Sequence, residues 1–306
     1  MSGATRWWGY DVAVVALYEV QQARRKRLLQ ALVLAYAAAT GAAHWGFVQA
    51  LAEVEGQVAD TLHVARTERP GTLIQEVVAS ESMRRFLGDL VGDSTTLDRL
   101  LDTPVLALWA GAVGMVLLPV LAMAGTTASI SAEIESRSIR YLALRTERLP
   151  IVLGKLLGQV GMLAAAALVG VLVTEAAGLT LMVRVPPLAL LLGALEHTGR
   201  AWVYALPYAG LGLCASQWLG RTNVARVAGV LLLVGTTVAH PVLLWLSDTT
   251  LPGRFADLGR LFLPGTGWSD LWSSNPVDFS LGALRLVGVC LVWTAVGYLR
   301  FDRRDL

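Results

Sequence analysis

Residues 24–51 read RRKRLLQALVLAYAAATGAAHWGFVQAL, four basic side chains followed by a long run without a charged residue. An α-helix rises 1.5 Å per residue, so about 20 apolar residues cross a hydrocarbon layer of about 30 Å. The run from Leu28 to Leu51 is long enough to do so. Basic residues beside a span are retained on the cytoplasmic side of a membrane. The stretch therefore predicts a first transmembrane helix over residues 28–51, with its amino-terminal end in the cytoplasm.

The composition extends this interpretation to the whole chain. Of 306 residues, 55% are hydrophobic, only 16% are charged, and the formal net charge is +2. Soluble domains have a larger charged share. The basic residues gather at the ends of apolar runs, which favours membrane orientation and excludes a nucleic-acid partner. Cys214 and Cys290 each lie inside an apolar run, so no disulfide framework is expected.

Five more apolar runs follow the first. The six predicted spans are residues 28–51, 105–129, 151–181, 202–219, 224–246 and 281–299. Spans three to six, their short loops and a cytoplasmic tail fill residues 151–306. The apolar stretch 186–194 is too short to cross and is expected to be interfacial or re-entrant. The sequence thus predicts an all-α, multi-pass protein of the plasma membrane, the inner membrane of a bacterium. It is a six-helix transmembrane bundle with both termini in the cytoplasm.

Two segments outside the spans have recognisable patterns. Residues 1–27 place apolar side chains at helical intervals, which predicts an interfacial helix before the first span. Residues 52–104 are polar and rich in carboxylates, and are typical of a small helical extracytoplasmic cap. Its candidate contacts to a partner protein are Glu53, Glu55, Asp60, Glu76 and Glu81. A solvated acidic lid is the alternative for this segment.

The third span has small residues at a spacing of four. Gly154 and Gly158 form one such pair, and Ala166 and Gly170 form another, which predicts that a neighbouring helix approaches closely there. Lys155 lies near the start of this span and is expected to reach back to the membrane interface. With Lys155 placed there, the span interiors are almost free of charge, which argues against an ion-coupled transporter with carboxylates at the midplane.

Templates for catalysis are missing from the sequence. The four histidines are scattered, and neither a Cys-x-x-Cys nor a His-Glu-x-x-His pattern occurs. The Gly154-Lys155 pair lacks the earlier glycine and the hydroxyl residue of a phosphate-binding loop. We therefore expect no enzyme activity, no metal and no cofactor in this chain. If ATP drives the protein, ATP and Mg²⁺ bind to another subunit.

The segment between the second and third spans, residues 130–150, carries most of the functional information. Its apolar residues share related helical faces, and Glu133, Arg137 and Arg140 are spaced for charge pairs along a helix. This predicts one stiff, charged helix below the membrane. A solvated loop that only satisfies membrane orientation is the alternative.

Residues of this segment resemble the permeases of type-2 ABC exporters. The loop of that family contains acidic residues, a Thr-Leu-like pair, a leucine run and an Ile-Val-Leu-Gly-Lys entry into the third span. The matching places here hold Glu133, Glu135, Ser138-Ile139, Leu142, Leu144 and Ile151-Val-Leu-Gly-Lys155. Arg137 stands where the family often has glycine, and Thr146 where it often has proline. The six-span layout extends the resemblance over most of the chain.

The resemblance implies partners and a mechanism. In that family the loop is a coupling helix that docks on an ABC ATPase, and two permeases with two ATPases form the working unit. It implies ATPase-coupling roles for Glu133, Glu135, Arg137, Arg140, Arg145 and Arg148. A homodimer of permeases in the lipid bilayer is the expected arrangement.

Two functions remain open at this point. The first is a permease of an ATP-driven exporter that moves an amphipathic or lipid-like substrate, since the predicted path is apolar. The second is a mechanical or scaffolding subunit acting on a periplasmic client through residues 53–102. That alternative follows from a likeness to family members that serve maturation of periplasmic copper enzymes such as nitrous oxide reductase.

Overall fold

The structure is a computed structural model that describes residues 8–63, 69–71, 81, 85, 94–183, 185–249 and 261–304. The regular elements in these ranges are helices, and none of them is a strand. They are α1 (Trp8–Arg25), α2 (Leu28–Leu62), α5 (Ser94–Asp102), α6 (Val105–Thr126), α7 (Ser131–Glu135), α8 (Ile139–Ala143), α9 (Arg148–Leu181), α10 (Pro187–Trp218), α11 (Thr222–Thr249), η1 (Ser269–Trp272) and α13 (Pro276–Asp302). The predicted all-α class is confirmed.

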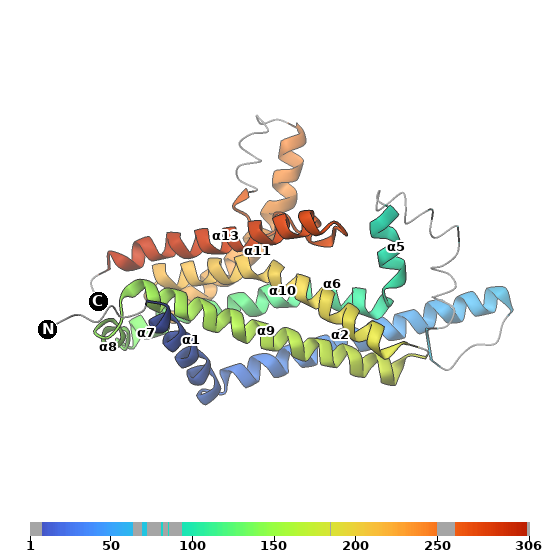
Figure 1. Cartoon of the computed structure of the whole chain (residues 1–306), viewed down its shortest axis with the longest axis horizontal. Helices are drawn as coiled ribbons and strands as arrows, with labels where there is room; N and C mark the ends of the chain where they lie inside the picture. The colour runs from blue at the N-terminus through green and yellow to red at the C-terminus, as the bar shows by residue number, and fades with distance from the viewer. Residues whose placement is uncertain are drawn as a thin grey trace.

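The long helices lie side by side and form an elongated bundle (Figure 1). Five stretches within the described residues are long and apolar enough to cross a membrane. They are Leu29–Thr61, Val105–Glu135, Arg148–Leu181, Thr222–Leu243 and Pro276–Asp302. The first turn of α1, the last turn of α13, and α7 and α8 lie at one end of the bundle, and α5 lies at the other (Figure 1). The protein is therefore a multi-pass membrane protein.

Helix α10 lies at the centre of the bundle and packs against α6, α9 and α13. Each residue from Ala205 to Gln217 is buried. Gly210 lies against the backbone of Cys290 on α13, and Gly212 lies against Thr126 on α6. A side chain at either glycine would collide with that neighbour. Because other helices cover α10, its sequence does not need the apolar surface that lipid contact demands from the outer helices.

The expectation of a separate interfacial piece at residues 186–194 is wrong. Those residues form the first turns of α10, which continues without a break to Trp218. Pro186 and Pro187 start the helix, and a proline in the first turn is tolerated because its missing N–H would have no intrahelical partner. Glu196, His197 and Arg200 interrupt the apolar pattern in mid-helix, which made the two halves look like separate segments.

Helix α1 folds back against α9. Lys26 and Arg27 separate α1 from α2, and Arg27 adopts a left-handed backbone conformation with φ of 56°. The buried side of α1 comprises Val12, Val15, Glu19 and Ala23, and it contacts α9 where the two glycines of the third span lie. A Cβ atom on Gly154 would lie 2.5 Å from Val15 Cβ, and one on Gly158 would lie 2.9 Å from Glu19 Cβ. The helix that approaches these glycines is therefore α1.

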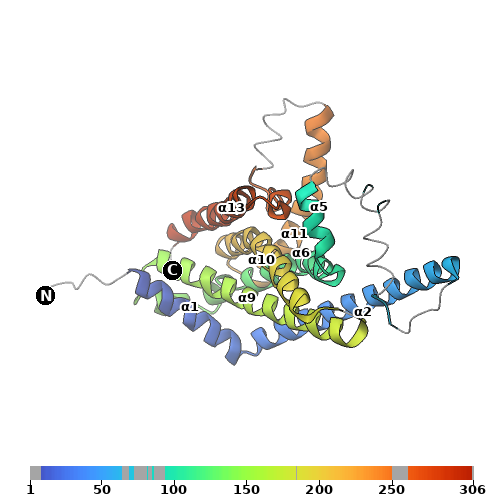
Figure 2. The same ribbon diagram turned by 45° about the vertical axis from the view of Figure 1, so that its right-hand side comes forward.

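The other two small residues face different neighbours. Gly170 packs against the ring of Tyr36 on α2, at 2.8 Å from its would-be Cβ to Tyr36 Cε1. Ala166 is buried in the main hydrophobic cluster. Helix α2 therefore packs against the C-terminal half of α9, and α1 packs against its N-terminal half (Figure 2).

Helix α2 is longer than the predicted first span. It continues to Leu62 and projects beyond the ends of α9 and α10 in both views (Figures 1 and 2). Leu51, Glu55 and Ala59 recur every four residues and are buried, so the helical pattern does not stop at the membrane boundary. The carboxylate of Glu55 accepts hydrogen bonds from Gly71 N at 3.0 and 3.1 Å. Nearly half of the predicted cap, including Glu76, lies outside the described residues.

Helix α11 is the least enclosed of the long helices. Its first half contacts α6, α7 and α10, while its C-terminal part rises away from the other helices in both views. Exposed apolar side chains cover its surface: Val224, Val227, Val230, Leu231, Val234, Val238 and Val242. In this structure those side chains would contact lipid or another chain.

We predict that Gly154→Ala weakens the packing of α1 on α9. The new methyl group would overlap Val15 and the carbonyl of Val12, and such overpacking costs about 1–3 kcal/mol. Gly161→Ala on the same helix meets nothing within 4 Å and is the matched control. The thermal midpoint of the solubilised protein, and the rate of trypsin cleavage at residues 24–27, would measure the effect. Equal behaviour of the two variants would show that the contact does not hold α1.

Candidate functional site

The site is at the end of the bundle where α1, α7, α8 and the end of α13 meet (Figure 1). At its centre is Lys155 in the second turn of α9, with 1% of its side chain exposed. Lys155 Nζ donates to Glu19 Oε2 of α1 at 2.6 Å and to Glu133 Oε1 of α7 at 2.8 Å. The expectation that Lys155 reaches the membrane interface is therefore wrong, because α1 and α7 cover it.

The cluster of Lys155, Glu19 and Glu133, called here the buried ion cluster, holds one positive and two negative charges. Gln159 Nε2, one turn further along α9, donates to Glu19 Oε1 at 3.0 Å. The second oxygen of Glu133 is buried without a partner among the described groups. Charges removed from water are retained only when paired, so these bonds hold α1, α7 and α9 in one arrangement.

Other side chains connect α7 to the remaining helices. Ser216 Oγ on α10 accepts from Ile130 N at 3.0 Å and from Ser131 N at 2.9 Å, and so satisfies free N–H groups at the start of α7. The carboxylate of Glu135 accepts from Thr222 N at 3.0 Å and from Thr222 Oγ1 at 2.5 Å, at the start of α11. One five-residue helix is thus bonded to α9, α10 and α11.

The single stiff helix expected for residues 130–150 is replaced by two short helices, α7 and α8. Arg137 between them has φ of 60°, a left-handed conformation that ends a helix. Ser136 Oγ bonds back to Ala132 O at 2.8 Å, which offers the backbone an alternative to a continued helix. The expected pairing of Glu133 with Arg137 and Arg140 is also wrong. The turn directs Glu133 inward to Lys155 and leaves both arginines exposed.

Beyond the turn, α8 presents an exposed apolar surface. Tyr141 is 75% exposed and Leu144 is 83% exposed, whereas Ile139 on the opposite side is buried. Arg140 and Arg145 flank them and are exposed too. We call Arg140, Tyr141, Leu144 and Arg145 the α8 surface. Large apolar side chains exposed beside charged ones are typical of a protein interaction site.

Arg148 has a different role from the other arginines of this segment. Its guanidinium donates to the carbonyl of Phe301 at 3.1 Å and to the carbonyl of Asp302, and lies over the Phe301 ring. Cations near the last carbonyls of a helix are favourable. Arg148 therefore joins the start of α9 to the end of α13.

Residues 13–306 match the model of a protein family described as ABC-2 family transporter protein. The chain belongs to the ABC-2 transporter family. The match confirms the resemblance to type-2 ABC permeases that residues 133–155 indicate. It makes the protein a membrane permease component of an ABC transporter, and membership of the family implies an ABC ATPase as partner. A comparison with curated proteins found no match.

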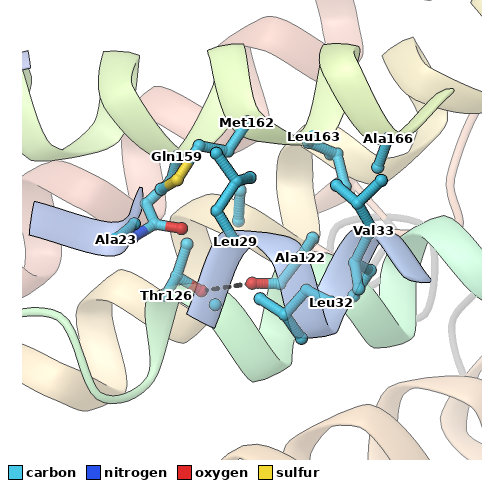
Figure 3. Close-up of a pocket in the computed structure, with 13 residues that line it drawn as sticks. Ala23, Leu29, Leu32, Val33, Ala122, Thr126, Gln159, Met162, Leu163 and Ala166 are labelled. Atoms are coloured by element: carbon cyan, nitrogen blue, oxygen red, sulfur yellow. Dashed lines mark hydrogen bonds between the residues drawn. The ribbon is translucent and has the colours of Figure 1, made fainter. Parts of the chain in front are cut away.

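A small cavity lies beside the buried ion cluster, between α2, α6 and α9 (Figure 3). Leu29 and Val33 of α2 point toward α9, Leu32 lies beside Ala122 of α6, and Gln159 is a polar group at the edge of the cavity (Figure 3). The cavity has a volume of about 20 Å³, room for about one water molecule. It is too small for a substrate of this ABC-2 permease.

The candidate partner residues of the cap do not form one group. Glu53 and Asp60 are exposed on the projecting part of α2, and Glu81 is exposed and paired with Arg85 at 2.6 Å. Glu55 is buried and is bound to Gly71. Its carboxylate therefore fixes the backbone of residues 69–71 in place and does not face a partner.

Sequence reasoning missed Glu19, Gln159 and Ser216 as members of the site. A signal existed only for Glu19, which lies on the apolar side of α1 at helical spacing from Val12, Val15 and Ala23. An acidic residue in that position needs a buried cation, and Lys155 is the basic residue inside the third span. Ser216 has an ordinary position in an apolar run, and only the packing of α10 against α7 gives it a role.

We predict that Lys155→Met destabilises the permease by about 3–5 kcal/mol, because it leaves two buried carboxylates without their cation. Replacing Glu19 and Glu133 by Leu in the same chain should restore at least half of the loss, since no buried charge then remains. The thermal midpoint of the solubilised protein compares the variants. If the triple variant is no more stable than Lys155→Met, the unpaired charge is not the cause.

Arg137→Gly is expected to stabilise the permease by up to about 1 kcal/mol. Glycine adopts a left-handed conformation without the steric cost that a side chain carries. Arg140→Gly removes the same charge inside α8 and should instead cost about 1 kcal/mol through lower helix propensity. The same thermal assay measures both, and changes of the same sign in the two variants would contradict the role of the turn.

Proposed function

We propose that this ABC-2 permease uses the α8 surface to bind an ABC ATPase and transmits the motion of that subunit through α7 and the buried ion cluster. The observation that carries the proposal is the juxtaposition of exposed Tyr141 and Leu144 with a helix that is bonded to α9, α10 and α11 and, through Lys155, to α1. A force applied to α8 would reach α7 through the short turn of residues 136–138 and would then pass to the spans through these bonds.

The proposed orientation places this end of the bundle in the cytoplasm. Exposed basic residues gather there: Arg24, Arg25, Lys26, Arg27, Arg137, Arg140, Arg145, Arg221, Arg226, Arg300 and Arg303. Short cytoplasmic loops carry such an excess. Both termini are then cytoplasmic. Helix α10, which its neighbours enclose, crosses the membrane in addition to the five helices identified by length and composition. The membrane is the plasma membrane, and in a bacterium it is the inner membrane.

In the proposed complex, two permeases and two ATPases form the working unit. The exposed apolar side of α11, including Val227, Val230 and Val234, is suited to a second copy of this chain or to lipid. ATP and Mg²⁺ bind to the ATPase, and the permease itself has no catalytic step. The apolar character of the helices favours an amphipathic or lipid-like substrate, moved by alternating positions of rigid helix groups.

In a second hypothesis the ATPase is coupled to the permease in the same way, but the motion acts on another protein instead of a transported substrate. Glu53 and Asp60 are exposed on the part of α2 that projects beyond the bundle. An acidic projection on the extracytoplasmic side favours a basic or metal-carrying client, as in the maturation of periplasmic copper enzymes. ATP-driven motion would then act on that client and would move no substrate across the membrane.

We predict that Tyr141→Ala with Leu144→Ala weakens binding of the ATPase by roughly 100-fold, since truncating each central apolar contact costs about 1–2 kcal/mol. Both side chains are exposed, so the fold should be unaffected. Leu188→Ala, at an exposed position near the other end of α10, is the control. Co-purification measures binding of the ATPase, and the ATP hydrolysis rate of the reconstituted complex measures its coupling to the permease. Unchanged binding of the double variant would remove α8 as the docking surface.

A further inference from the structure

A second cavity lies at the opposite end of the bundle from α7 and α8. It has a volume of about 430 Å³, within the range of small-molecule sites. Helix α5, the middle of α10 and the start of α13 form its walls. Its lining residues are Arg99, Leu195, Glu196, Gly199, Arg200, Ser273, Ser274, Pro276 and Phe279.

Two arginines in this cavity share a single carboxylate. Arg200 donates to Glu196 Oε1 at 2.7 Å, and Arg99 of α5 is bonded to the same oxygen. Two guanidinium groups against one carboxylate leave one positive charge unbalanced among the lining residues. Arg200 is fixed in place, with 7% of its side chain exposed, by a hydrogen bond of 2.6 Å to Leu271 O and by the Phe279 ring 5.4 Å away.

An anion that completes the pairing of a cation stabilises it in a membrane protein. The side chain of Arg99 is 40% exposed, so it is accessible to such an anion. Guanidinium groups match the oxygen geometry of carboxylates and phosphates. Ser274 supplies a further group, because its hydroxyl has no partner among the described residues. The site is therefore suited to an oxyanion that contacts Arg99 and Arg200.

An apolar groove of about 180 Å³ adjoins this cavity between α9 and α10. Leu195 and Gly199 line both spaces. The groove is otherwise lined by Ala164, Ala167, Leu168, Val171, Thr198 and Trp202. A Cβ atom on Gly199 would meet nothing within 4 Å, so the absence of a side chain there leaves the two spaces open toward each other.

We propose that this pair of spaces binds an anionic phospholipid from the leaflet on the α5 side of the bundle. The phosphate group contacts Arg99 and Arg200, and one acyl chain lies in the apolar groove along α9 and α10. The charge on the headgroup balances the second guanidinium, and the groove accounts for the attached chain. This inference concerns binding by the permease alone, so it can fail without affecting the proposed coupling to an ATPase, and the reverse is also true.

The test is lipid binding to the purified full-length permease, followed by native mass spectrometry with phosphatidylglycerol or phosphatidylcholine of the same chain length. We expect preferential binding of phosphatidylglycerol. Arg99→Gln should weaken it about tenfold because it removes one charge-assisted contact. Glu196→Gln should tighten it severalfold because it removes the competing carboxylate. Arg99 and Glu196 are bonded to each other. Opposite effects of their substitution on lipid affinity cannot come from a general loss of folding.

Further arms separate a lipid from a free anion. Gly199→Leu should weaken phosphatidylglycerol binding by filling the space between cavity and groove, whereas inorganic phosphate alone should compete poorly. Arg303→Gln, which removes an exposed arginine at the other end of the bundle, is the control and should have no effect on lipid binding. Equal binding of the two lipids, or unchanged affinity in both Arg99→Gln and Glu196→Gln, would overturn the proposal. Binding of inorganic phosphate as tight as that of lipid, with no effect of Gly199→Leu, would overturn it too.

Discussion

The arrangement of the helices at the α7 and α8 end of the bundle depends on one buried ammonium group. Lys155 extends from α9 into a space closed by α1 and α7, and its charge can stay there only because Glu19 and Glu133 come from those two helices. The close approach of α1 is possible because Gly154 and Gly158 leave room for its backbone. Small residues and one lysine on α9 thus determine where an amino-terminal helix and a loop helix dock. The position of the α8 surface, the proposed binding site of the ATPase, follows from that docking.

Much of the fold could be predicted from the sequence, because membrane spans are specified by long apolar runs. The starts of α2, α6 and α11, and the basic residues at one end, follow within two residues from hydropathy and charge alone. Helix α10 was harder to predict since its position is central. Glu196, His197 and Arg200 are tolerated there by contacts with α5, η1 and α13, and a single sequence does not reveal such contacts.

For residues 130–150, too, the sequence revealed local features but not the contacts with distant residues. Its family resemblance and its place between two spans were evident, and the family match confirms the membership. Local spacing favoured one helix with Glu133 facing Arg137, but the decisive partner of Glu133 lies on α9, 22 residues further along the chain. The left-handed conformation of Arg137 ends α7 and separates it from α8. Helix spacing alone predicts neither this break nor a partner for Glu133 on another helix.

The contacts of α7 differ in how readily they can open. Lys155, Glu133 and Ser216 are shielded from water, so separating them exposes charges or backbone groups to a dry interior. The bond between Glu135 and Thr222 lies in solvent, where water replaces it at little cost. Helix α7 is therefore held more firmly to α9 and α10 than to α11. In the proposed coupling, a tilt of α7 would open its contact with α11 before its contacts with the other two helices.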